Sequence, residues 1–253
     1  MTTMHQLSKI IAKLMVTITM AGCGAIAQQA PIRCLPLFPE GALIAPDKRW
    51  PDHQIDVCWD NLQETTVSDR LLVQETIRSQ ITARYPVTLR GWGPCTADRN
   101  AASAIHIRVA DSTPHTMAIG NDLAGVPGGM LLNVTFKKWS PNCSLNETSR
   151  QNCIRSIAVH EFLHGLGVEH EHERADTPAA CAARTEQHGD GLSGPIAIGT
   201  WDSHSATNYC NRSWNNGGVL SAGDVNALQA LYPEAAAAHQ QHSDQVDAGM
   251  CQK

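Results

Sequence analysis

Three features are absent from this 253-residue chain, and each absence excludes a class of protein. There is no basic run or arginine-rich arm, and the formal net charge of -5 argues against a nucleic-acid binder. No apolar run is long enough to cross a bilayer. No C-x-x-C pair occurs among the nine cysteines, so a cysteine-based zinc site is not indicated. Without internal repeats, the length suits one domain of ordinary size plus appendages.

The N-terminal residues have the features of an export signal. Lys9 and Lys13 supply positive charge, and residues 14–20 form a short apolar region. Residues 25–27 read Ala-Ile-Ala, a small-residue cleavage pattern that predicts a signal peptide over residues 1–27. Residues 20–23 read Met-Ala-Gly-Cys and also resemble a bacterial lipobox, whose cleavage would leave a lipid anchor on Cys23 after a signal of residues 1–22. Secretion, a periplasmic location and lipid anchoring at the cell envelope all stay open.

Cysteine usage fits an exported protein. Cys23 either leaves with the signal or is lipidated, and the eight other cysteines are an even number, which favours disulfides. Cys143 and Cys153 bracket a short polar loop and are the first pair expected. Cys181 and Cys210 are the second pair expected.

Composition and periodicity divide the rest of the chain. Residues 28–50 are rich in proline and are expected to be irregular or a pro-segment, residues 51–233 to be the folded domain, and residues 234–253 to be a polar tail. Alternation predicts strands over 54–59, 104–109 and 128–134, and helical spacing predicts a helix over 68–83. A second helix is expected before residue 166, with Thr148 or Ser149 as its cap. Residues 178–199 are expected to form a loop near the cleft.

Residues 160–170 read H-E-x-x-H-x-x-G-x-x-H and are the most informative segment. Side chains at i and i+4 share a helix face, so His160 and His164 can direct two imidazoles at one metal ion. Gly167 allows the chain to turn back and bring His170 as a third ligand. Three protein ligands leave the open position of a catalytic zinc, and Glu161 suits a general base.

Two other interpretations of the segment are weaker. His172 is a rival third ligand, but Gly167 is placed to serve His170. A structural zinc usually closes with a fourth Cys or His. The segment therefore predicts Zn²⁺ hydrolysis chemistry.

The longer run from His160 to Asp176 resembles the astacin signature H-E-x-x-H-x-x-G-F-x-H-E-x-x-R-x-D of the metzincin zinc endopeptidases, with Val168 in place of Phe. Residues 205–209 resemble the metzincin Met-turn S-x-M-x-Y, except that Thr207 replaces the methionine. Residues 220–233 resemble the C-terminal helix of these domains. The resemblance is specific from about residue 150 to 233.

That resemblance implies an α+β fold with a twisted mixed sheet, an edge strand over the cleft, a zinc-site helix and a C-terminal helix. By chain order, residues 129–133 are the expected edge strand, which would bind extended peptide by strand addition. The resemblance also implies that Tyr209 stabilises the oxyanion, and that a freed N-terminus pairs with Glu171. For the C-terminal helix, Ser221 is a good N-cap and Asp224 occupies N3.

Together these observations predict an exported zinc metalloendopeptidase acting on proteins or peptides. His160, His164 and His170 hold the metal, and Glu161 and Tyr209 are catalytic. No substrate-binding residue or oligomeric state is indicated. The alternative is a non-catalytic zinc-binding surface module on a degenerate protease fold, which Thr207 favours and Glu161 argues against. A hydrolase for non-peptide amides stays open as well.

Overall fold

The structure is a computed structural model that describes residues 40–85, 87–96, 101–185 and 194–233. The chain divides into Met1–Leu37 and a compact unit, Phe38–Lys253, to which all described residues belong. The expected signal peptide, the lipobox with Cys23 and the polar tail lie outside the described residues.

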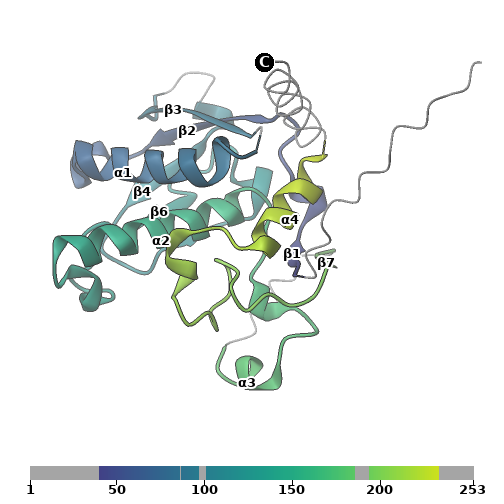
Figure 1. Ribbon diagram of the computed structural model, residues 1–253. Coiled ribbons are helices and arrows are strands. Elements are labelled where there is room, and N and C mark those ends of the chain that lie inside the picture. The colour runs from purple at the N-terminus through teal and green to yellow at the C-terminus, as the bar shows by residue number, and fades with distance from the viewer. Residues whose placement is uncertain (1–39, 86, 97–100, 186–193, 234–253) are drawn as a thin grey trace, which may run out of the picture. The chain divides into compact units, whose positions relative to one another are not determined.

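A five-stranded sheet with the order β3-β2-β4-β6-β5 forms one layer of this unit (Figure 1). Its strands are β2 (Gln54–Trp59), β3 (Thr88–Pro94), β4 (Ile105–Val109), β5 (His115–Thr116) and β6 (Met130–Leu132). Strands β3, β2, β4 and β6 pair in parallel, and β5 pairs with β6 antiparallel. The expected mixed sheet of an α+β fold is therefore confirmed.

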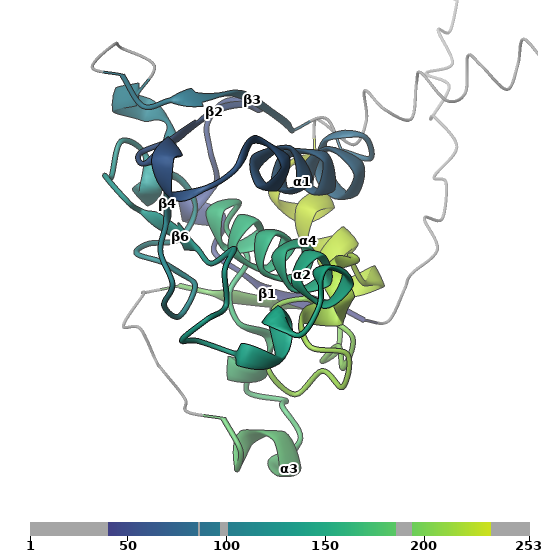
Figure 2. The ribbon, with the colours of Figure 1, turned by 90° about the vertical axis from the view of Figure 1, so that its left-hand side faces the viewer.

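Two helices, α1 (Val67–Ile77) and α2 (Glu147–Gly165), lie side by side on one face of that sheet (Figure 2). A five-residue π-helix, Arg78–Thr82, continues α1, so the predicted helix over 68–83 is confirmed in substance. Strand and helix residues share one apolar core; its largest fully buried side chains include Trp59, Phe136, Phe162, Ile77, Ile105 and Leu132. Burial of this apolar surface holds α2 rigidly against the sheet.

A second, two-stranded sheet lies beside the last helix. Strand β1 (Ala42–Ile44) pairs antiparallel with β7 (Ile196–Ile198), and α4 (Ala222–Leu231) packs on β1. The expectation that residues 28–50 are irregular is therefore wrong at residues 42–44. The apolar side chains of β1 are buried, and their removal from water stabilises the strand.

The predicted edge strand is also wrong. The segment 129–133 contains β6, which is an interior strand between β4 and β5. The edge on that side is the two-residue β5, and β3 at the other edge was not predicted either. Strand β5 is too short to show alternation, and β3 contains glycines at 91 and 93 and ends in a proline, residue types that argue against a strand.

Three disulfides join described residues: Cys58–Cys95, Cys143–Cys153 and Cys181–Cys210. The last two are the pairs expected from the sequence. Cys34 and Cys251 lie outside the described residues. In the 178–199 segment, the short helix α3 (Ala179–Ala182) and β7 interrupt the expected loop. No helix in the described part of the chain is long and apolar enough to cross a membrane.

Candidate metal centre

Helix α2 places His160, Glu161 and His164 together at its buried C-terminal end. The N-cap of the helix is Asn146, whose side chain accepts the N–H of Ser149 at 2.9 Å, so the caps expected at Thr148 or Ser149 are wrong. It ends where Gly167 adopts φ +100° and donates its N–H to the carbonyl of His164 at 3.0 Å. That left-handed turn is the one expected of Gly167 and directs the chain toward His170.

The structure brings His160, His164 and His170 into one cluster, with their potential ligand atoms within 4.8 Å of one another. The Nε2 atoms of His160 and His164 are 3.1 Å apart. The Nδ1 atoms face the other way: that of His160 lies 2.7 Å from the carbonyl oxygen of Ala206, and that of His164 lies 2.7 Å from the carbonyl oxygen of Val168.

These contacts determine where the protons are. A carbonyl oxygen only accepts, so each Nδ1 carries the hydrogen and donates it. Burial lowers the pKa of both His160 and His164 to about 3, so both rings are neutral and both Nε2 atoms present lone pairs. Two facing lone pairs repel each other unless a cation lies between them. Two nitrogens bound at ~2.1 Å to one tetrahedral ion are about 3.4 Å apart, so the donor set fits zinc.

The carboxylate of Glu161 lies in the same buried region. Burial raises its pKa to about 8. Its Oε2 atom is shielded from solvent and has no hydrogen-bond partner among the described residues. A cation held by the neighbouring histidines would favour the charged form, which is the form a general base needs.

Tyr209 and His172 flank the third histidine. The Tyr209 ring, 54% exposed, lies 4.6 Å from the His170 ring between centroids and stacks on the His172 ring at 4.3 Å. The Nδ1 atom of His172 accepts the N–H of Tyr209 at 3.4 Å. His172, the rival third ligand, is therefore oriented toward Tyr209, and His170 is the residue that clusters with the two helix histidines.

A buried carboxylate supports the turn beneath His160. Asp224, in the first turn of α4, accepts the N–H of Ala206 at 3.0 Å and the hydroxyl of Ser205 at 2.8 Å. The same side chain completes the capping box of α4 with Ser221. Thr207, at the methionine position, is fully buried, and its Oγ1 lies 3.0 Å from that of Ser205. The sequence predicted the capping box, but not the tertiary contact that connects α4 with the carbonyl supporting His160.

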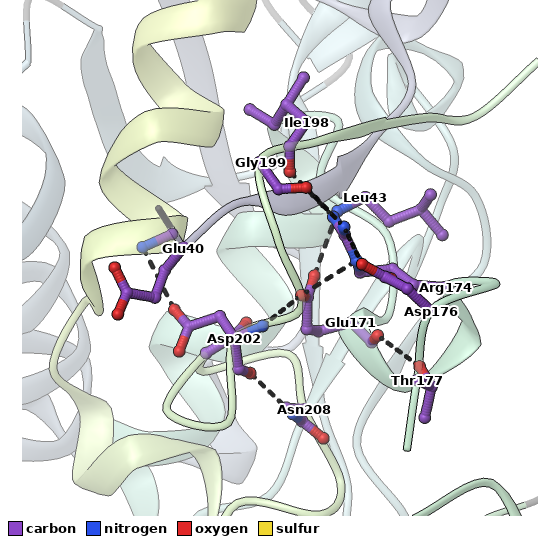
Figure 3. A network of polar contacts seen from close by, with 12 residues as sticks. Glu40, Leu43, Glu171, Arg174, Asp176, Thr177, Ile198, Gly199, Asp202 and Asn208 are labelled. Atoms are coloured by element: carbon purple, nitrogen blue, oxygen red, sulfur yellow. Dashed lines mark hydrogen bonds and ion pairs between the residues drawn. The ribbon is translucent and has the colours of Figure 1, made fainter. Parts of the chain in front are cut away.

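A second polar network surrounds the residue after His170 (Figure 3). The buried Glu171 carboxylate accepts the N–H of Leu43 at 3.2 Å and that of Asp202 at 2.8 Å. Arg174 pairs with Asp176 through two bonds of 2.8 and 2.9 Å and donates to the carbonyls of residues 198 and 199. Glu171 thus accepts backbone N–H groups of β1 and of residue 202, while the freed N-terminus expected to pair with it lies outside the described residues.

A cavity of about 420 Å³ opens over the histidines. Residues 114–119, which include the edge strand β5, form one wall, and Glu169 and Tyr209 contribute beside the histidines. An edge strand over the cleft is therefore present, although it is β5 and not the predicted segment. No residue pattern in 114–119 indicated this wall before the fold was known, because its position depends on pairing with β6.

Comparison with known proteins supports the fold. No family model and no curated protein matches the sequence. Among solved structures, myroilysin aligns with a TM-score of 0.54 at 16% identity, covering 76% of this chain and 98% of that one. High choriolytic enzyme 1, a hatching enzyme zinc-protease from the medaka fish Oryzias latipes, aligns with a TM-score of 0.44 at 16% identity, covering 74% and 93%.

The chain has the fold of myroilysin, and its mixed sheet and helices agree with the α+β arrangement expected from the sequence. Myroilysin shares that fold over nearly its whole length.

Proposed function

We propose that this protein is an exported zinc endopeptidase of the astacin-like metzincin type. The observation that carries the proposal is the cluster of His160, His164 and His170 beneath an open cavity. In this cluster the Nε2 atoms of His160 and His164, each with a lone pair, are 3.1 Å apart. The fold shared with myroilysin and the signature through Asp176 support the proposal. Export is supported by three disulfides and by the signal-like N-terminus, with lipid attachment at Cys23 as one form of it.

The positions of these residues support the following roles. Zn²⁺ held by the three histidines would supply a Lewis acid that polarises a scissile carbonyl and lowers the pKa of water. Glu161 takes the proton of the attacking water and transfers it to the leaving amine. Tyr209 lines the cavity, and its hydroxyl would donate to the oxygen that gains negative charge. The backbone of β5, at the sheet edge, suits pairing with an extended peptide or protein substrate.

The competing proposal is a non-catalytic zinc-binding module, favoured by Thr207 at the methionine position. Both proposals require zinc binding, so the deciding variant must keep the metal and lose the base. Glu161→Gln keeps the shape of the side chain and removes its basicity.

We expect purified wild-type protein to cleave an unfolded protein substrate, and a zinc chelator to stop the cleavage. Glu161→Gln should lose at least about 10²-fold in rate while keeping one zinc per chain, because general base catalysis typically contributes that much. Glu64→Gln, at an exposed position, serves as the matched control. Full activity in Glu161→Gln would refute the catalytic role, and zinc binding without cleavage by the wild type would favour the binding module.

A further inference from the structure

The three histidines differ in the group that faces Nδ1. For His160 and His164 that group is a backbone carbonyl at 2.7 Å. For His170 it is a carboxylate at ion-pair distance: Oε1 of Glu173 lies 3.5 Å from its Nδ1 atom, which is longer than a hydrogen bond. Both side chains are largely buried, with exposed fractions of 19% for His170 and 12% for Glu173. The centre therefore has one carboxylate–histidine pair beside two carbonyl–histidine pairs.

The local backbone holds Glu173 in that position. Residues Glu171–Glu173 form one turn of 3₁₀ helix directly after His170, and the N–H of Glu173 donates to the His170 carbonyl at 3.1 Å. Glu171, at the start of the turn, accepts the N–H groups of Leu43 in β1 and of residue 202. Arg174, just after the turn, donates to the carbonyls of residues 198 and 199 (Figure 3). Because the turn is anchored at both ends and the Glu173 side chain is only 12% exposed, that side chain has little room to move away from His170.

We propose that Glu173 is the positioning residue of the third histidine. When the ring binds the metal, the Glu173 carboxylate would accept the hydrogen of His170 on Nδ1 and so leave Nε2 for the metal. A nearby carboxylate also makes the imidazole a better donor to a cation than a neutral carbonyl does. The inference rests on the proposed zinc site and adds to it a residue outside the ligand motif.

The alternative is that Glu173 binds the metal directly, because His170, His172 and Glu173 also bring potential ligand atoms within 4.8 Å of one another. The position of His172 argues against that second arrangement, because its Nδ1 accepts the Tyr209 amide and its ring stacks on Tyr209. The positioning role needs only the contact between Glu173 and His170.

The test is zinc affinity, measured on the full chain by competition with a chromophoric chelator. We expect Glu173→Ala to raise the zinc dissociation constant by about 10- to 100-fold, the usual effect of losing a partner of a metal-binding histidine. Glu173→Gln, which keeps an acceptor but not the charge, should be affected less. Glu64→Gln should bind as the wild type does. The thermal midpoint of each metal-free variant should match that of the metal-free wild type, which excludes a merely structural effect.

The outcomes separate this inference from the proposed function. If the wild type binds no zinc, the proposed function itself fails. If the wild type binds zinc and both Glu173 variants bind it equally well, only the positioning role is overturned. A changed ligand field in the visible spectrum of cobalt-substituted Glu173→Gln would show that Glu173 binds the metal itself, and would also overturn that role. Weakened binding with an unchanged cobalt spectrum supports it.

Discussion

At the residue scale, each histidine of the centre uses its two ring nitrogens differently. One nitrogen is held by the protein, through a carbonyl for His160 and His164 and through the Glu173 carboxylate for His170, as we propose. For His160 and His164 the other nitrogen, Nε2, faces the common centre. The protein thereby selects the tautomer of these two rings before any ion arrives, and a preorganised donor set loses less freedom on binding.

Tyr209 can be tested without disturbing that donor set. Tyr209→Phe removes only the hydroxyl and keeps the stacking of the ring on His172. Because the hydroxyl is proposed to stabilise developing negative charge, we expect kcat to fall about 10²-fold with zinc affinity unchanged. Steady-state kinetics on a peptide substrate and a zinc titration measure both quantities.

The control for this substitution is Tyr85→Phe, because Tyr85 packs against the core away from the cavity lining. It should leave kcat unchanged. If Tyr209→Phe retains full kcat, the hydroxyl has no part in turnover.

At the scale of elements, α4 supports the metal centre without contributing a ligand. Asp224 connects the start of this helix to the turn whose Ala206 carbonyl holds His160. Asp224→Ala would leave the N–H groups of Ala206 and Ser221 and the Ser205 hydroxyl without their acceptor. We expect a loss of about 3 kcal/mol or more in the free energy of unfolding of the metal-free protein, together with weaker zinc binding.

Urea denaturation and chelator competition measure these two effects. Gln229→Ala, on the same helix, is the matched control and should change neither by much. Weakened stability with normal zinc affinity would show that the turn keeps its shape without Asp224.

Elements also show what the sequence alone could and could not predict. The cluster of His160, His164 and His170 was predictable because eleven consecutive residues encode it through helix periodicity and one glycine turn. The Asp224 support joins residues 18 positions apart, and the wall at β5 depends on pairing of a two-residue strand with β6. Neither leaves a local pattern. Strand β1 was missed because nearby prolines outweighed three apolar residues that become buried only against α4 and β7.

At the scale of the whole molecule, buried titratable groups determine how the stability of the metal-free protein depends on pH. Burial lowers the pKa of His160 and His164 to about 3, so below their ordinary value of 6.5 the unfolded chain binds more protons and stability rises with pH. Burial raises the pKa of Glu161 and Glu171 to about 8 from 4.5, so in that range the native state binds more protons and stability falls as pH rises.

The sum predicts a specific profile for these four groups. These groups favour stability that rises up to about pH 4.5 and falls between about pH 6.5 and 8, and between these values the two effects oppose each other; burial also raises the pKa of Asp224, which adds to the fall as pH rises. Glu161→Gln removes one carboxyl contribution, so above about pH 4.5 its stability should fall less with rising pH than that of the wild type. Urea denaturation at a series of pH values, with chelator present, measures both profiles. Identical profiles for the two proteins would contradict burial as the cause.

The contact between Asp224 and the Ala206 turn has a further consequence for how the protein is made. The three histidines leave the ribosome before Ala206, and Ala206 leaves before α4. A nascent chain that has exposed its histidines but not its last helix lacks the supports that orient His160. A centre with all of these supports therefore forms only after α4 has been synthesised, so under the proposed function a chain that stops before α4 would be a poor protease.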